Sequence, residues 1–328
     1  MAEARVILHL PRRHLGDYAV VGHLRIFARI VAVLTPLGAR IEVRDRRLAP
    51  FEGGDARAYA DGNLHIIENG RVQAPGVLNT TMAYLPPFWH LDAKGVLAES
   101  SIGGRDYAPG AVQPAMAFFR DLRAKWVGPR RSRHRQAPSG AALPEGAIAV
   151  FLQGGLPQDR GLAYCAPDEM LRTVAAGCDG RIVLVKPHPL ALEADRAVIA
   201  QAQSEGFAIT ETSANLHDIL ETAAVSVSFN SAVALEGFLH RTPALLFGPS
   251  DFHHFAETVQ APAEFSAALA RALARPDAGY AQFLHWYFRV QCLNVDAGDF
   301  PARLLATFAA AGFAGERLGL KAALPGKA

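Results

Sequence analysis

The chain has 328 residues, half of them hydrophobic and a fifth charged, which excludes disorder over the whole chain. At about 150 residues per domain, this length predicts roughly two domains. The net charge of +2 at pH 7 argues against a general nucleic-acid binder, and no apolar stretch is long enough for a transmembrane helix. The three cysteines are scattered, which is typical of a reducing cytosol and gives no metal-binding CxxC pattern: Cys165, Cys178 and Cys292.

The first part of the chain predicts a mixture of strands and helices with long loops. Residues 5–10 predict a strand, residues 23–37 a helix that stops at Gly38, and residues 40–44 a second strand. Residues 64–72, with Asn69-Gly70 in the middle, predict a hairpin, and residues 113–127 an amphipathic helix. Residues 128–146 combine arginines, prolines and small residues, which is typical of a linker between two unequal parts.

The second part has a more regular pattern. Strands are predicted at residues 147–152, 182–185, 207–210, 224–229 and 243–247, and helices at 168–176, 195–205, 216–223 and 232–240. This alternation predicts a Rossmann-like parallel sheet with helices on both faces. The helix predicted at residues 283–293 is rich in aromatics and is expected to pack as core across the two domains. Ligands of such sheets bind at the carboxyl ends of the strands, so the loops after Leu152, Val185, Phe229 and Phe247 are expected to converge.

The loop that follows the strand at residues 224–229 is the first candidate site. Ser228, Asn230 and Ser231 stand where a strand ends and a helix begins, and that helix contains Glu236. Free backbone N–H groups and the positive end of the helix dipole suit a phosphate there. The alternative is a simple helix cap, because Asn and Ser also stabilise helix N-termini without any ligand.

The loop Lys186-Pro187-His188-Pro189 is the second candidate, at the end of another strand of the same sheet. The prolines stiffen it and hold His188 at the edge where ligands bind. An imidazole there can donate to a phosphate oxygen or protonate a leaving group, and Lys186 can supply a fixed charge. A structural or exposed histidine is the alternative.

The loop after the strand at residues 147–152 is the third candidate. Gly154 lets the backbone approach a ligand closely, and Gln153 can hydrogen-bond a base or a sugar. Asp159 is a candidate nucleophile or base, and Arg160 a candidate anion contact. The alternative is a plain turn with both side chains solvated.

Two further segments are ambiguous. The aromatics of Phe88-Trp89-His90-Leu91-Asp92, with Ser100 and Ser101 downstream, suit either carbohydrate binding or a core strand. The basic run is interpreted as a solvated linker, with contact to an anionic membrane or a lipid-linked acceptor as its alternative; its residues are Arg130, Arg131, Ser132, Arg133, His134 and Arg135. No motif supports a Walker loop, a dinucleotide fingerprint or a metal site.

The KPHP loop, the segment SFNSAVALEG and the strand TPALLFG occur in an order that resembles two-domain GT-B glycosyltransferases. More narrowly, residues 147–248 resemble the capsule polysaccharide biosynthesis family, which includes bacterial β-Kdo transferases. The resemblance implies an α/β GT-B-like fold with two Rossmann-like domains and a cleft between them. It implies an acceptor-side domain at residues 1–135, a nucleotide-sugar domain at 146–280, and C-terminal helices at 281–328 that cross back to the first domain.

The resemblance also implies the donor and the residues that bind it. A CMP-sugar, with CMP-Kdo expected, would be the substrate, without a cofactor or a metal. His188 and Pro189 would face the phosphate, Glu236 would hold the ribose, and Asp159 would be the nucleophile of a retaining reaction, with Asp92 in reserve. Further donor contacts would come from Gln153, Gly154, Arg160, Lys186, Ser228, Asn230 and Ser231.

The sequence therefore predicts a glycosyltransferase that acts on a capsule or lipopolysaccharide glycan or on a lipid-linked acceptor. The expected location is the cytoplasm, with the inner face of the cytoplasmic membrane as an alternative. Two other functions remain open on the same scaffold: a CDP-polyol phosphotransferase or UDP-sugar epimerase, and a non-catalytic subunit that binds a glycan or a nucleotide.

Overall fold

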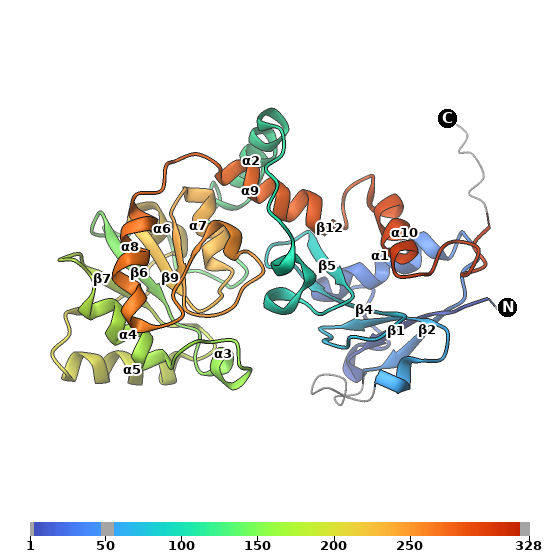
Figure 1. Cartoon of the computed structure of the whole chain (residues 1–328), viewed down its shortest axis with the longest axis horizontal. Helices are drawn as coiled ribbons and strands as arrows, with labels where there is room; N and C mark the ends of the chain where they lie inside the picture. The colour runs from blue at the N-terminus through green and yellow to red at the C-terminus, as the bar shows by residue number, and fades with distance from the viewer. Residues whose placement is uncertain (1–2, 47–55, 322–328) are drawn as a thin grey trace. The chain divides into compact units, whose positions relative to one another are not determined.

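The computed structural model of the chain describes residues 3–46 and 56–321 (Figure 1). The chain forms two compact units. The first contains the residues up to Arg105 and those from Phe288 onward, and the second runs from Asp106 to Tyr287. None of the helices within the described ranges is long and apolar enough to cross a membrane.

The first unit is built on a six-stranded sheet in the order β12-β5-β4-β3-β1-β2. Strands β1 to β4 are parallel, whereas β5 and β12 each run antiparallel to their inner neighbour. The bounds are β1 (Val6–Leu10), β2 (Ile41–Asp45), β3 (Leu64–Glu68), β4 (Val77–Met82), β5 (Phe88–Asp92) and β12 (Leu293–Asn294).

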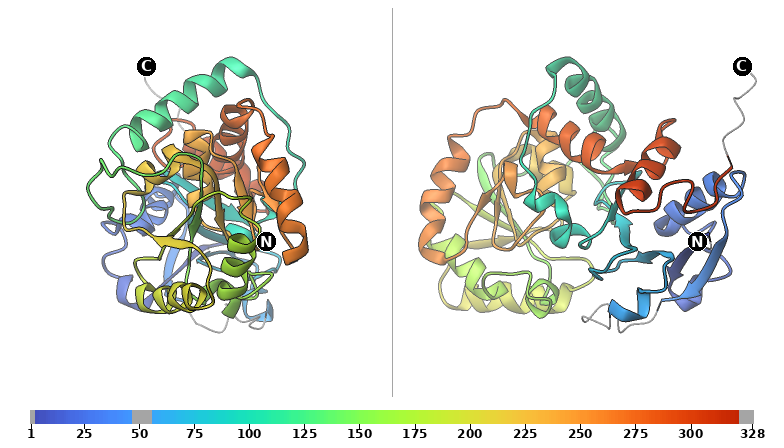
Figure 2. Two further views of the ribbon diagram at one scale, coloured as in Figure 1. Left: turned by 90° about the vertical axis from the view of Figure 1, so that its left-hand side faces the viewer. Right: turned by 45° about the vertical axis from the view of Figure 1, so that its right-hand side comes forward.

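Helices from both ends of the chain cover this sheet. Helix α1 (Arg25–Leu34) buries Ile26, Ile30 and Leu34, and α10 (Phe300–Ala310) buries side chains at the same four-residue spacing. Both helices share one apolar cluster with β1. Figure 2 shows the red C-terminal helices beside the blue N-terminal ones. The C-terminal segment is therefore part of the first unit's core.

The predicted hairpin at residues 64–72 is wrong. Strand β3 is a single strand with parallel neighbours on both sides, and the chain after it returns to begin β4. The side chain of Asn79 on β4 explains the difference. Its Oδ1 accepts from the backbone N–H of Val72 and its Nδ2 donates to the backbone O of Val72, so the chain after the Asn-Gly turn is tied to β4 and does not pair with β3.

The second unit has a fully parallel six-stranded sheet in the order β11-β10-β9-β6-β7-β8. Counted from β6, this is the doubly wound order 3-2-1-4-5-6, which reverses between β6 and β9. The bounds are β6 (Ala147–Phe151), β7 (Val183–Lys186), β8 (Ile209–Glu211), β9 (Ala223–Ser228), β10 (Ala244–Leu246) and β11 (Glu257–Thr258). The predicted Rossmann-like parallel sheet is confirmed.

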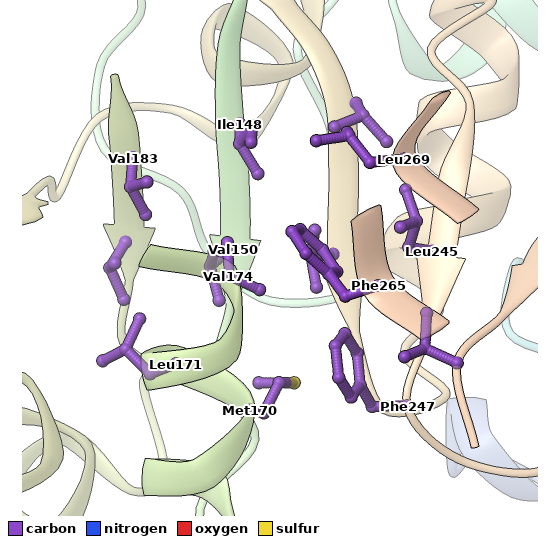
Figure 3. Close-up of a cluster of buried hydrophobic side chains, with 14 of the residues drawn as sticks. Ile148, Val150, Met170, Leu171, Val174, Val183, Leu245, Phe247, Phe265 and Leu269 are labelled. Carbon is purple, nitrogen blue, oxygen red and sulfur yellow. The ribbon is translucent and has the colours of Figure 1, made fainter. Parts of the chain in front are cut away.

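Helices cover both faces of this sheet. Ile148 and Val150 of β6 join one buried cluster, which includes α4 and α8 (Figure 3). Ala149 and Phe151 join another, with α6. This two-residue alternation with both faces buried is expected of a parallel strand inside an α/β domain. The helices are α2 (Val112–Trp126), α3 (Leu156–Asp159), α4 (Pro167–Ala176), α5 (Leu192–Ser204), α6 (Leu216–Thr222), α7 (Val233–His240), α8 (Phe265–Leu273) and α9 (Tyr280–Leu284).

The chain passes from the first unit to the second after Arg105 and returns after Tyr287. The linker predicted at residues 128–146 lies within the second unit. Helix α2 precedes that segment but belongs to the second unit, because it packs against α9 and α7. The helix expected at residues 283–293 is α-helical only to Leu284 and continues as a π-helical turn, His285–Gln291. The chain passes back to the first unit within this turn.

Candidate functional site

The candidate site lies at the carboxyl edge of the second sheet, where the strand order reverses. Gln153, two residues after β6, faces the loop that follows β9. Its Oε1 accepts from the backbone N–H groups of Phe229 (3.0 Å) and Asn230 (3.2 Å), and its Nε2 donates to Asn230 Oδ1 (3.3 Å). The two loops on either side of the reversal, the usual ligand position in such sheets, are thus joined.

Asn230 extends this junction to the loop after β10. Its Nδ2 donates to the backbone O of Leu162 (2.9 Å) and of Pro249 (3.3 Å). Together with its contacts to Gln153, these bonds use both ends of the Asn230 amide. The residue therefore fixes three loops relative to one another.

Asp195, in the first turns of α5, was not predicted as a site residue, yet it joins the remaining loop. Its side chain is 1% exposed. Oδ1 accepts from Gly154 N–H (2.9 Å) and Oδ2 from His188 N–H (2.7 Å), so one carboxyl group holds the loops after β6 and β7. Burial raises the pKa of Asp195, and the two backbone N–H groups act in the opposite direction. The predicted convergence of the four loops is confirmed by these bonds.

Gly154 is required at its position for two reasons. Its φ is +64°, in the left-handed region that favours glycine. In addition, a Cβ there would lie 2.8 Å from the Cβ of Ala191. The backbone of the loop after β6 can approach the start of α5 this closely only without a side chain.

His188 is half-buried, and its tautomer follows from its contacts. Nδ1 accepts from the backbone N–H of Leu190 (3.2 Å), so the neutral ring carries its proton on Nε2. Burial lowers the pKa of His188, and the nearby His134 and Arg133 lower it further. The neutral ring can donate one hydrogen bond to an anion, and a bound anion would favour its protonation.

Lys186 and Pro189 flank His188 in different environments. Lys186 Nζ donates to the backbone O of Ala214 (2.6 Å), and burial lowers its pKa. Its charge is therefore directed at the carbonyls of the loop that precedes α6. Pro189 is exposed.

The serines before α7 organise the turn at which that helix begins. Ser231 Oγ accepts from Val233 N–H (3.3 Å), and Ser228 Oγ accepts from Ser231 N–H (3.4 Å). These bonds are long, and the N-cap residue Ala232 provides no side-chain cap. The side-chain cap is therefore weak, although Ala234 N–H and Glu236 N–H also donate to the backbone O of Ser231 (3.2 Å) and of Ala232 (3.1 Å). An anion at this helix start would compete with these bonds.

Glu236 on α7 is almost fully enclosed, with 1% of its surface exposed. Ser132 Oγ donates to its Oε1 (3.0 Å), while within the described residues its Oε2 has no hydrogen-bond partner and lies 3.8 Å from His217 Nε2. Burial raises the pKa of Glu236 to about 8, so the carboxyl group is largely protonated at neutral pH. A ribose would reach this group only if the segment containing Ser132 moved.

That segment, residues 128–146, is called the strap below, and it is not a solvated linker. Arg130 pairs with Asp218 and Glu221 of α6. Further along, partly buried side chains alternate with exposed arginines: Ser132 contacts Glu236, the ring of His134 lies 5.3 Å from that of His188, and Gln136 Oε1 accepts from Leu216 N–H (3.1 Å).

A pocket of about 310 Å³ lies along the strap. Its lining includes Arg130, Arg131, His134, Arg135 and Asn215 and contains no carboxylate. Because His134 also contacts His188, the pocket adjoins the edge of the sheet. The two-residue alternation of arginines with Ser132, His134 and Gln136 was the sequence signal that this run packs on the domain.

Asp159 and Arg160 lie at the end of the short helix α3 and are exposed. Neither side chain has a hydrogen bond or an ion pair with any described residue. The carboxylate of Asp159 folds back toward Gly155, where an added Cβ would lie 3.8 Å from Oδ2. Asp159 is thus an unengaged carboxylate on the loop that also carries Gln153.

Asp92 ends β5 in the first unit and is buried. Oδ1 accepts from the backbone N–H groups of Lys94 and Gly95, and Oδ2 from the N–H and the Oγ–H of Ser101. Asp92 therefore contacts the downstream Ser101 directly, and these hydrogen bonds stabilise the loop that follows β5. Phe88 and Trp89 are core side chains with 2% and 1% exposure, which favours the core interpretation over carbohydrate binding.

Comparisons with known proteins support the fold. No protein-family model matches the sequence, and no curated protein matches it. Similar solved structures include KpsC from Thermosulfurimonas dismutans, beta Kdo 2,4 transferase, at 12% identity and a TM-score of 0.52, over 87% of this chain and 90% of that chain. A second similar structure is KpsC, beta Kdo 2,7 transferase, from the same organism. It is 11% identical, has a TM-score of 0.52, and the match covers 86% of this chain and 89% of that chain. The chain therefore has an α/β, GT-B-like fold with two Rossmann-like domains.

Proposed function

We propose that this protein is a glycosyltransferase that moves a sugar from a CMP-linked donor, with CMP-Kdo as the expected donor, to a bacterial surface glycan or a lipid-linked acceptor. The observation that carries the proposal is the hydrogen-bonded junction of Gln153 and Asn230 at the reversal of the second sheet. His188 stands beside it, held by Asp195. The likeness in fold to the two KpsC structures is consistent with the proposal.

The proposed chemistry needs the leaving phosphate to be stabilised by fixed donors. The Nε2–H of His188 and the first turn of α7 supply such donors from two loops that Asp195 and Gln153 hold in place. A CMP-linked donor leaves with a single phosphate, which these donors would contact.

The retaining version of the reaction assigns the nucleophile to Asp159. Its carboxylate attacks the anomeric carbon, and the bonding electrons leave with the phosphate oxygen of CMP. The acceptor hydroxyl then displaces the carboxylate and passes its proton to solvent, so that two inversions yield net retention. The exposed and unengaged state of the Asp159 side chain leaves it available for this attack.

The first test is a thermal-shift panel of CMP, CDP, UDP, GDP and NAD with the whole chain. A ligand present at 100 times its dissociation constant stabilises the native state by about 2.7 kcal/mol, which is readily measured. We expect a shift with CMP. A shift with CDP or UDP alone would instead favour a phosphotransferase or an epimerase, and no shift with any nucleotide would contradict the proposal and favour a subunit that binds a glycan.

The second test separates binding from chemistry. Asp159→Asn is expected to lower the turnover of CMP-Kdo by at least about 100-fold while CMP still binds. Asp179→Asn is the matched control, because Asp179 is exposed on the loop before β7, at the opposite edge of the sheet. If Asp159→Asn retains full turnover, the nucleophile has been assigned to the wrong residue.

A further inference from the structure

The outer side of the strap carries a row of positive charge. Arg131, Arg133 and Arg135 occur within five consecutive residues, and all three are exposed. None of them has a side-chain ion pair with a described residue, whereas the neighbouring Arg130 is neutralised by Asp218 and Glu221. The inward contacts of the strap fix its backbone, so the three charges are displayed on a rigid support.

The strap is anchored through its backbone as well as through its side chains. The backbone O of Arg131 lies 2.5 Å from His217 Nε2, and the backbone O of Ala137 accepts from Asn215 Nδ2 (2.9 Å). The N–H of Gly140 donates to Asp218 Oδ2 (2.8 Å). None of these contacts uses a guanidinium group of the row, so those groups can be changed without loosening the strap.

An exposed apolar side chain stands beside this row. Leu190 is 78% exposed, one of the most exposed large apolar residues among those described. Its backbone N–H is bonded to His188 Nδ1, and the His188 ring contacts His134 of the strap. Arg133 also lies close enough to His188 for its charge to act on that ring. The turn that carries Leu190 and the strap that carries the arginines are therefore neighbouring exposed segments.

The turn that carries Leu190 is stiff. Pro187 and Pro189 restrict its backbone, and Asp195 binds the N–H of His188. Transfer of an exposed leucine side chain from water to an apolar phase is favourable. Basic residues near an anionic bilayer are attracted to it, and an apolar side chain beside them can add to binding by entering the acyl boundary.

We propose that Arg131, Arg133, Arg135 and Leu190 form a docking surface for an anionic lipid bilayer. The arginines meet the lipid phosphates, and Leu190 enters the acyl boundary. A polyanionic glycan would match the charges equally well, but it offers no apolar phase for Leu190. The surface adjoins the donor site proposed above through His188, but its binding to lipid can be tested without nucleotide or turnover.

The test is co-sedimentation of the full chain with vesicles of phosphatidylcholine alone or mixed with phosphatidylglycerol, at low and high salt. The first variant is Arg131→Gln/Arg133→Gln/Arg135→Gln. Its matched control, Arg12→Gln/Arg13→Gln/Arg120→Gln, removes the same charge from exposed arginines outside the strap. Leu190→Asn tests the apolar contribution separately. Melting curves of each variant establish that it is folded.

We expect binding only to the vesicles that contain phosphatidylglycerol, and we expect salt to weaken it. At about 1 kcal/mol for each arginine near the surface, the strap variant should bind about 100-fold more weakly, while the control variant changes by less than about threefold. Leu190→Asn should weaken binding by roughly tenfold.

Three results would overturn the proposal. The first is equal binding to both kinds of vesicle, and the second is equal loss in the strap and control variants. The third is retention of the wild-type chain on heparin without any binding to vesicles, which would assign the arginine row to a polyanionic glycan.

Discussion

Asp195 offers the sharpest test of how the site is held together. Asp195→Asn keeps the shape of the side chain but replaces one oxygen by an NH₂ group. In the wild-type chain the two oxygens accept from Gly154 N–H and His188 N–H at 2.9 and 2.7 Å. In the variant, one of these buried N–H groups loses its acceptor and faces another donor.

The expected loss in the free energy of unfolding follows from the hydrogen bonds that Asp195 makes. A hydrogen bond to a charged group contributes about 1.5–3 kcal/mol, and an unsatisfied buried donor costs about 1–3 kcal/mol. Part of this loss is offset, because the neutral asparagine avoids the unfavourable burial of a charge. The same burial raises the pKa of Asp195 in the wild-type chain. We therefore expect a loss of about 2–4 kcal/mol, which lowers the Tm by roughly 4–16 °C for a unit of this size.

The assay is urea unfolding followed by circular dichroism, with CMP titration as a second readout. Glu193→Gln is the matched control, because Glu193 is exposed in the first turn of the same helix and tests the helix-dipole contribution of about 0.3–1 kcal/mol. CMP affinity should fall about tenfold in Asp195→Asn and stay unchanged in the control. Equal loss of stability in the two variants would show that the Asp195 carboxylate does not hold the two loops.

Two further predictions concern Glu236 and Gly154. The pKa of Glu236 is about 8 in the folded chain against an ordinary value of 4.5, so the native state holds the extra proton and stability falls as pH rises from about 4.5 to 8. In the wild-type chain, the free energy of unfolding measured with urea should fall by a few kcal/mol, as an order of magnitude, between pH 5 and 8, and Glu236→Gln should remove this fall. If the free energy of unfolding of the variant falls with pH as steeply as that of the wild type, Glu236 is not the group responsible. Gly154→Ala should destabilise the chain by at least about 1 kcal/mol more than Gly161→Ala, because the two glycines have φ of +64° and +66° but only Gly154 meets Ala191. Equal melting temperatures of the two alanine variants would contradict this.

The sequence predicts the second unit well because its signals are local. Most of its strands are short apolar runs and the helices between them are amphipathic, so the alternation indicates a parallel sheet. Strand β11 (Glu257–Thr258) has no apolar run, and the sequence does not predict it. The first unit is harder, since Asn69-Gly70 is a strong hairpin signal that a tertiary contact overrides. The Asn79 side chain that binds Val72 lies in the next strand, and no local pattern points to it.

Some residues of the candidate site also follow from local sequence patterns, whereas others depend on tertiary contacts. Gln153, His188 and Asn230 could be predicted because they follow strands of a sheet whose ligand-binding edge is known in advance. Asp195 could not, because its role depends on two backbone groups that only the folded chain brings together. The strap resembled a linker because its composition is polar, although its alternation of arginines with smaller polar residues is the pattern of a segment packed on one side.

The most direct test of the central proposal is calorimetric titration of the whole chain with CMP. We expect saturable binding that weakens at least tenfold in His188→Ala and is unchanged in His23→Ala, a variant of an exposed histidine in the first unit. The absence of heat with CMP, or equal affinity in the two variants, would contradict the assignment of the carboxyl edge of the second sheet as the donor site.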